Sequence, residues 1–301
     1  MNRLAYSLTL ICVLATTACG GLSIVQEEPG AYSVGYRNIE IDRPDGSSFW
    51  AWVFYPADQA EKDTAIVHGV ERFPVVSFGH GFLQPVQRYR YSLRDLASHG
   101  YIVIATNSHH GLTPDHAEYS DDLARCLTHI VSSSRTERSW LFDRVDTESL
   151  ALSGHSMGGG AAVAAAREID VKVLITLAGA PLRSKPAAGE HRPEYELHIV
   201  GDADRIVPPA ASRTLLDAPG LFVIIRGGSH CGFMDETVIG CDEAEIAHDE
   251  QLRITRVLMR SFLDLHLKGQ EALYDEFWVE HPLELEGLVE FSRSELSEQE
   301  D

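Results

Sequence analysis

One short stretch, Ala151–Gly160, limits the possible folds of this chain more than any other. It holds Gly-His-Ser-Met-Gly at Gly154–Gly158, between a β-prone run at Ser149–Ser153 and an alanine-rich helical run at Ala161–Arg167. A serine on so tight a strand-to-helix turn needs small residues two positions before and after it, because larger side chains would collide. The turn exposes the Ser156 hydroxyl at a helix N-terminus, where developing negative charge is favoured. The stretch therefore predicts a nucleophile at Ser156; the alternative is a chance match in which the serine only caps the helix.

Predicted strands alternate with predicted helices through most of the chain. Apolar runs without polar alternation, such as Phe73–Phe78 and Tyr101–Thr106, indicate buried parallel strands. Further strands are expected at Ser149–Ser153, Val171–Ala178, Glu196–Val200 and Leu221–Arg226, and helices at Arg88–His99, Glu118–Ser133, Pro209–Asp217 and Ile246–Leu267. In the first helix, the residues expected to pack inward are Tyr91, Leu93, Leu96 and Ala97. The alternation predicts an α/β fold with a mostly parallel central sheet flanked by helices, and Tyr32–Ile41 with Phe49–Tyr55 adds an antiparallel N-terminal hairpin.

The partners of Ser156 are expected beyond the carboxyl ends of later strands, where an α/β sheet places its reacting groups. His230 follows the last strong strand and a glycine turn, so its imidazole is the predicted base that takes the serine proton and returns it to the leaving group. The alternative is a loop histidine without that role. Two aspartates after the preceding strand compete to orient the imidazole. Asp204, deeper in its loop, is the predicted acid, whereas Asp202 is expected to bond nearby turn backbone.

An oxyanion hole needs two backbone N–H groups aimed at one oxygen. The first is expected from Met157, which follows the nucleophile at the helix N-terminus. The second is expected from Phe82, in the turn after Phe73–Phe78, whose side chain is then available as a substrate wall. His80 in the same turn is expected to pack inward or to hydrogen-bond the turn.

Together these motifs resemble the α/β-hydrolase superfamily and, within it, the branch of dienelactone hydrolases, bacterial cutinase-like polyester hydrolases and platelet-activating-factor acetylhydrolases. The segments that carry the resemblance are Phe73–Phe82, Leu96–Ala105, Leu152–Gly160, Val200–Pro208 and Gly227–His230. The resemblance implies an α/β-hydrolase fold and ester hydrolysis. It also implies that Asp204 is the triad acid, because in polyester hydrolases the aspartate before x-Ile-x-Pro has that role. The loop Leu177–Leu182 lacks the tryptophan that polyester hydrolases usually carry there, so no aromatic wall is expected at this place.

The N-terminus is predicted to be a targeting segment. A short positive start is followed by the apolar run Leu8–Ala15, which is too short to cross a bilayer. The small residues up to Cys19 resemble a bacterial lipoprotein signal, with cleavage before Cys19 and lipid on its thiol. Thr16 replaces the usual aliphatic residue, so ordinary signal-peptidase cleavage stays open. The predicted divisions are a signal peptide over residues 1–18, a linker over 19–31, an α/β-hydrolase domain over 32–283 and an acidic tail over 284–301.

Export would place the chain in an oxidising compartment, where cysteines pair. Of the five cysteines, Cys12 leaves with the signal and Cys126 lies in a helical pattern, as a buried free thiol. Cys231 and Cys241 share one loop, and we expect a disulfide between them; two unpaired thiols are the alternative. A zinc site is less favoured because neither belongs to a close Cys-x-x-Cys pair.

Charge and spacing argue against several other classes of partner. The formal net charge is −20, with 45 acidic and 25 basic residues, which opposes binding to nucleic acid or to an anionic membrane surface. Two polar clusters resemble metal ligands in type but not in spacing, and a polar loop and a solvated acidic loop explain them better. They are Asn107, His109, His110 and His116, and Asp235, Glu236, Asp242, Glu243 and Glu245. No metal and no cofactor are predicted, and membrane contact is expected only through the lipid anchor.

The sequence as a whole predicts an exported, envelope-anchored or secreted serine ester hydrolase that forms an acyl-enzyme on Ser156. Its expected substrate is a small-molecule or polymeric ester. The alternatives are a peptidase or other acyl hydrolase on the same scaffold, and a non-catalytic binding lipoprotein of the cell envelope.

Overall fold

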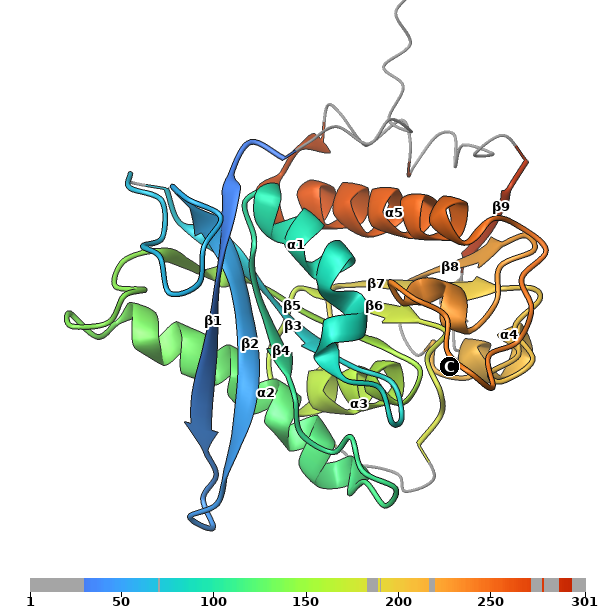
Figure 1. Ribbon diagram of the computed structural model, residues 1–301, viewed down its shortest axis with the longest axis horizontal. Helices are drawn as coiled ribbons and strands as arrows, with labels where there is room; N and C mark the ends of the chain where they lie inside the picture. Colours follow the sequence, from blue (N-terminus) through green and yellow to red (C-terminus); the bar gives the residue numbers. More distant parts are fainter. Residues whose placement is uncertain are drawn as a thin grey trace, which may run out of the picture.

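The computed structural model describes residues 30–69, 71–182, 189, 191–216, 220–271, 278 and 287–293. In this part of the chain, nine strands form one sheet in the order β1-β2-β4-β3-β5-β6-β7-β8-β9 (Figure 1). The strands are β1 Ser33–Asp42, β2 Ser48–Ala57, β3 Phe73–Gly79, β4 Ile102–Thr106, β5 Val145–His155, β6 Val173–Leu177, β7 Tyr195–Gly201, β8 Gly220–Ile225 and β9 Val289–Arg293. The α-helices are α1 Arg90–Ser98, α2 His116–Ser134, α3 Met157–Glu168, α4 Pro209–Arg213 and α5 His248–Lys268.

Strand direction divides the sheet into a parallel centre and antiparallel margins. The strands from β4 to β8 pair in parallel, whereas β1 with β2, β2 with β4, and β8 with β9 pair antiparallel. β3 is buried at every residue, as its unbroken apolar run predicts. The predicted fold, a mostly parallel sheet with an antiparallel N-terminal hairpin, is confirmed.

Helices cover both faces of the sheet and create two apolar cores. α1 and α5 pack on one face, and α2 and α3 on the other (Figure 1). α2 is started by the Asp115 carboxylate, which accepts the N–H groups of Ala117 and Glu118, and α5 ends at Gly269, whose φ of +64° suits a residue without a side chain. These layers hold the carboxyl ends of the parallel strands at one edge of the sheet.

The first predicted helix begins at a later residue than expected and buries a different tyrosine. A 3-10 turn at Val86–Tyr89 precedes α1, so the helix begins later than predicted. Tyr89 is therefore the tyrosine that packs inward, whereas Tyr91, which was expected to do so, is 58% exposed. Leu93 and Leu96 are buried as predicted.

The last strand lies where the sequence predicted only an acidic tail. Residues 289–293 of the segment 284–301 form β9 and pair with β8. Val289 is buried against the core beside half-buried Phe291, while Glu290 between them is exposed. This alternation is a strand signal, but the surrounding acidic composition masked it.

Several predictions fall on parts of the chain that the structure does not describe. The leader, Cys12, Cys19 and most of the linker lie outside the described residues, as do residues 183–188 and 190 between β6 and β7 and the remainder of the tail. Within the described ranges, no helix has the length and apolar character needed to cross a membrane.

Candidate active site

Ser156 stands at the sharp junction between β5 and α3. Its φ of +54° is a conformation that L-residues rarely adopt, and its N–H donates to the Leu177 carbonyl at 2.9 Å. The flanking glycines have a steric cause. A Cβ at Gly154 would lie 2.3 Å from the Gly158 oxygen, and a Cβ at Gly158 would lie 2.1 Å from the Gly79 oxygen. Only glycine at both positions lets the turn pack against the end of β3.

Three side chains from three loops meet at this turn. His230 Nε2 lies 2.9 Å from Ser156 Oγ, and His230 Nδ1 lies 2.7 Å from Asp204 Oδ2. All three residues are buried, with Ser156 keeping the largest exposed fraction at 8%. They come from the loops after β5, β7 and β8, at the carboxyl edge of the sheet. The geometry is that of a nucleophile, a base and an acid joined in one line.

The two competing aspartates have different partners. Asp204 Oδ1 accepts the N–H groups of Ile206 at 2.9 Å and Val207 at 2.7 Å, which leaves Oδ2 directed at His230. Asp202 Oδ1 instead accepts the Gly227 N–H at 2.5 Å. The two backbone bonds hold the Asp204 carboxylate in one orientation, which is what an orienting acid needs.

The predicted oxyanion donors lie on two different segments, the start of α3 and the turn after β3. Met157 opens α3, where an N–H has no acceptor in a preceding turn. In the described part of the chain nothing accepts a hydrogen bond from the Phe82 N–H. The Phe82 turn is braced by His80, whose ring nitrogens lie 2.9 Å from the Gly81 oxygen and 2.7 Å from the Ser108 oxygen. Burial lowers the pKa of His80.

A cavity of about 230 Å³ opens beside the serine and is lined mainly by apolar groups. The Phe82 and Leu83 side chains on one side and Ile206 on another are between 43% and 49% exposed, and Ile239 is fully exposed. The complete lining is Gly81, Phe82, Leu83, Gln84, His155, Ser156, Ile206, His230, Cys231, Met234, Val238, Ile239, Gly240 and Cys241. This lining favours an uncharged, apolar ligand next to Ser156.

The predicted disulfide between Cys231 and Cys241 is confirmed, with a Cα–Cα separation of 5.7 Å. It closes a loop that starts directly after His230 and forms one wall of the cavity. Cys126 is a buried free thiol, as predicted, and burial raises its pKa well above the usual value. The thiol is therefore held in its unreactive protonated form.

The acidic residues around the disulfide are not the uniform solvated surface that the sequence suggested. Asp242 is half-buried, and its carboxylate accepts the N–H groups of His230 at 3.1 Å and Arg205 at 2.9 Å. It thereby joins the loop that carries His230 to the loop that carries Asp204. No local pattern marks Asp242 for this role, because both donors are distant backbone groups.

One histidine of the cluster after β4, His109, lies close to two carboxylates near the N-terminus of α2. His109 Nε2 lies 3.2 Å from Glu118 and 3.4 Å from Asp122, and Asp122 is bound by Arg43 at 2.6 Å. None of these residues lines the cavity at Ser156. Among the described residues there is no group of three or more His, Cys, Asp or Glu side chains placed to hold a metal ion.

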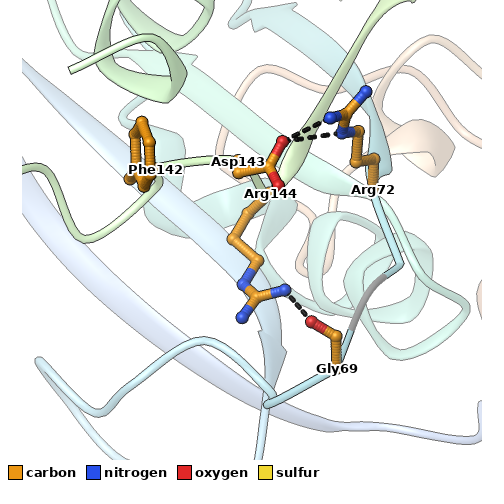
Figure 2. A pocket seen from close by; sticks show the side chains of 5 residues that line it. All are labelled: Gly69, Arg72, Phe142, Asp143 and Arg144. Atoms are coloured by element: carbon orange, nitrogen blue, oxygen red, sulfur yellow. Dashed lines mark hydrogen bonds and ion pairs between the residues drawn. The ribbon is translucent and has the colours of Figure 1, made fainter. Parts of the chain in front are cut away.

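A second hollow, of about 690 Å³, lies at the opposite end of the sheet, where β3 and β5 begin. Figure 2 shows its lining, in which Asp143 is bonded to Arg72, and Arg144 to the Gly69 carbonyl. Phe142 completes the lining. The lining holds no serine, cysteine or histidine, and its one carboxylate, Asp143, is paired with Arg72.

The half-buried carboxylate of Asp235 predicts a dependence of stability on pH. It lies in the disulfide loop and accepts the Tyr91 N–H at 2.9 Å, and burial raises its pKa from 3.8 to about 6. The folded state thus holds this proton more tightly than the unfolded chain does. Stability contributed by the protonated form is present below about pH 4 and is lost as the pH rises through about 6.

Replacing Asp235 by asparagine should therefore stabilise the protein at pH 8, because the amide oxygen keeps the Tyr91 contact without a buried charge. We expect a gain of about 1 kcal/mol after allowing for solvent screening of this partly exposed group. Urea unfolding at pH 5 and pH 8 measures it, with the exposed neighbour in Glu236→Gln as the control. Equal gains at both pH values would contradict the assignment.

Two comparisons relate the chain to known proteins. Residues 22–233 match a family described as PET hydrolase-like, and this region includes Ser156, Asp204 and His230. Cutinase 1 from Thermobifida cellulosilytica is 27% identical over 159 residues, which cover 52% of this chain and 53% of that protein. The chain therefore matches about half the length of this curated relative.

Proposed function

Because the chain belongs to the PET hydrolase-like family, we propose that it is a carboxylic ester hydrolase with Ser156 as its nucleophile. The observation that carries the proposal is the unbroken line from Ser156 Oγ through His230 to Asp204, with distances of 2.9 and 2.7 Å, at the wall of an apolar cavity. A line of this kind activates a hydroxyl for attack on an acyl carbon.

In the proposed reaction, Ser156 Oγ attacks the ester carbonyl while His230 Nε2 takes its proton. Asp204 holds the imidazole through Nδ1–H and stabilises the imidazolium that forms. The Met157 and Phe82 N–H groups stabilise the tetrahedral oxyanion. The alcohol then leaves with the proton from His230, and a water molecule deprotonated by His230 releases the acid and restores the serine.

The substrate class proposed here is an ester with an apolar acyl group, either a small molecule or a segment of a polymer. The exposed or half-exposed apolar side chains at the cavity mouth, Phe82, Leu83, Ile206 and Ile239, support this. The similarity to a protein named as a cutinase also supports an ester substrate.

A fluorophosphonate probe combined with matched substrates tests the proposal. We expect labelling at Ser156. In a series of p-nitrophenyl esters of rising acyl length, we expect each ester to be turned over faster than the p-nitroanilide with the same acyl group. Release of soluble products from a polyester film would extend the substrate to polymers. Labelling with turnover of anilides only would indicate a peptidase, and absence of both would indicate a binding protein.

We also propose that the chain is exported, with lipid on Cys19. The N-terminal pattern supports this, and the Cys231–Cys241 disulfide is typical of oxidising compartments. Mass spectrometry of the mature N-terminus tests it: a first residue other than a diacylated Cys19 would overturn the lipid anchor.

A further inference from the structure

A buried chain of hydrogen bonds behind the nucleophile connects two parts of the site that are distant in sequence. The Gly81 N–H donates to Tyr89 Oη at 3.0 Å, and Tyr89 Oη lies 2.9 Å from His155 Nδ1. His155 Nε2 then lies 3.1 Å from the backbone oxygen of His230. Tyr89 and His155 are each only 1% exposed, so water does not compete for these bonds.

The groups at the two ends of this series of hydrogen bonds decide which atom is the donor in each of them. The His230 carbonyl can only accept, so His155 Nε2 must carry a proton. Burial lowers the pKa of His155 well below its usual value, so the ring is neutral and Nδ1 is bare. The Tyr89 hydroxyl must then donate its single proton to Nδ1, and its oxygen is left to accept the Gly81 N–H.

The two ends of the chain are functional elements of the proposed mechanism. Gly81 precedes Phe82, the proposed oxyanion donor, and His230 is the proposed base. His155 itself precedes Ser156, and its ring centroid lies 4.7 Å from that of His230. A Cβ at Gly81 would lie 3.0 Å from His155 Nδ1 and 3.1 Å from Tyr89 Oη, so the turn packs directly on this pair.

We propose that Tyr89 and His155 are positioning residues, which hold the oxyanion turn and the backbone of the base in fixed register with Ser156. The proposal rests on the proposed function. These hydrogen bonds can all form in only one set of donor and acceptor directions. The turn at Gly81 and the loop of His230 therefore cannot shift separately without leaving a buried polar group unpaired. The neutral His155 ring also places no positive charge against the imidazolium that forms on His230.

The tautomer of His155 is the first test, and it does not depend on catalysis. Nitrogen-15 NMR of the labelled histidine rings should contain one ring that stays neutral and protonated at Nε2 from pH 5 to pH 8. His155→Gln should remove that signal and so assign it. Tyr89→Phe should shift its Nδ1 resonance, because the donated hydrogen bond is lost. A His155 ring that is protonated at Nδ1, or that becomes cationic at pH 6, would overturn the proposal whether or not the protein is active.

Kinetics with a matched pair of tyrosine variants is the second test. Tyr89→Phe removes one oxygen atom and should lower kcat about tenfold with KM changed less than twofold, since the defect lies in transition-state alignment. A boronic acid, which forms a tetrahedral adduct on the serine, should bind about tenfold more weakly. Tyr101 is an equally buried tyrosine that donates to Asp264 at 2.7 Å, at the far edge of the sheet. Tyr101→Phe should leave kcat and boronate affinity within twofold.

The outcomes separate this proposal from the proposed function. If the parent protein hydrolyses esters but Tyr89→Phe behaves like Tyr101→Phe in kcat and boronate affinity, the positioning role is wrong. If the parent hydrolyses no ester and reacts with no fluorophosphonate, the proposed function is wrong and the kinetic role of Tyr89 and His155 falls with it. The NMR result would still decide the hydrogen-bond directions in that case.

Discussion

Replacing Ser156 by alanine should lower kcat for ester hydrolysis by about 10⁶-fold, the loss expected when the nucleophile of such a triad is removed. The hydroxyl is held 2.9 Å from His230 Nε2 by a turn whose φ at Ser156 is +54°. No other hydroxyl lines the cavity, within the part of the chain that the structure describes. Steady-state hydrolysis of a p-nitrophenyl ester measures the loss, and fluorophosphonate labelling should disappear with it.

Ser153→Ala provides the matched control. Ser153 lies on β5, the strand that leads to Ser156, and is fully buried. Its hydroxyl has no hydrogen-bond partner among the described residues. Its loss should leave kcat within a few-fold and the melting temperature close to that of the parent. Equal activity of Ser156→Ala and Ser153→Ala would show that Ser156 is not the nucleophile.

Replacing Asp204 by asparagine should lower kcat by about 10⁴-fold with little change in the fold. The asparagine oxygen can still accept the Ile206 and Val207 N–H groups, as Asp204 Oδ1 does at 2.9 and 2.7 Å. The amide NH₂ would then point at His230 Nδ1 and force that nitrogen to accept. The ring would carry its proton on Nε2, facing Ser156, and could not act as the base. Kinetics and a thermal melt measure the two effects separately.

Asp202→Asn is the control that separates the two aspartates. Asp202 accepts only the Gly227 N–H in the contacts that the structure describes, and an asparagine oxygen can replace it. We expect kcat within about threefold of the parent, because His230 keeps its proton on Nδ1. A larger loss in Asp202→Asn than in Asp204→Asn would reverse the assignment of the acid.

The main architecture can be predicted from the sequence because each of its signals lies within a few neighbouring residues. The apolar strands, the glycine turn around Ser156 and the positions of Asp204 and His230 after consecutive strands can all be read within a few residues. The family membership confirms the predicted resemblance to cutinase-like polyester hydrolases. The order of the strands in the sheet then brings distant loops to one edge.

The remaining features depend on contacts between distant segments. A 3-10 turn precedes α1, and the helical pattern does not reveal it. Because of this turn, Tyr89 is buried in the core in place of Tyr91. β9 forms because β8 offers an unpaired edge. Tyr89 bonds the distant side chain of His155, and Asp242 bonds the distant backbone of Arg205. His155 carries no sign of its partners beyond its place next to Ser156.

The hollow at the start of β3 and β5 bears on how the protein could be attached to a solid support. β5 has 11 residues between this end and Ser156, a span of roughly 35 Å. Phe142, which is 44% exposed there, is a suitable anchor. A single linkage through Phe142→Cys would tether the molecule by the edge opposite its cavity and leave the mouth at Phe82 and Ile239 turned toward a bulky or insoluble ester.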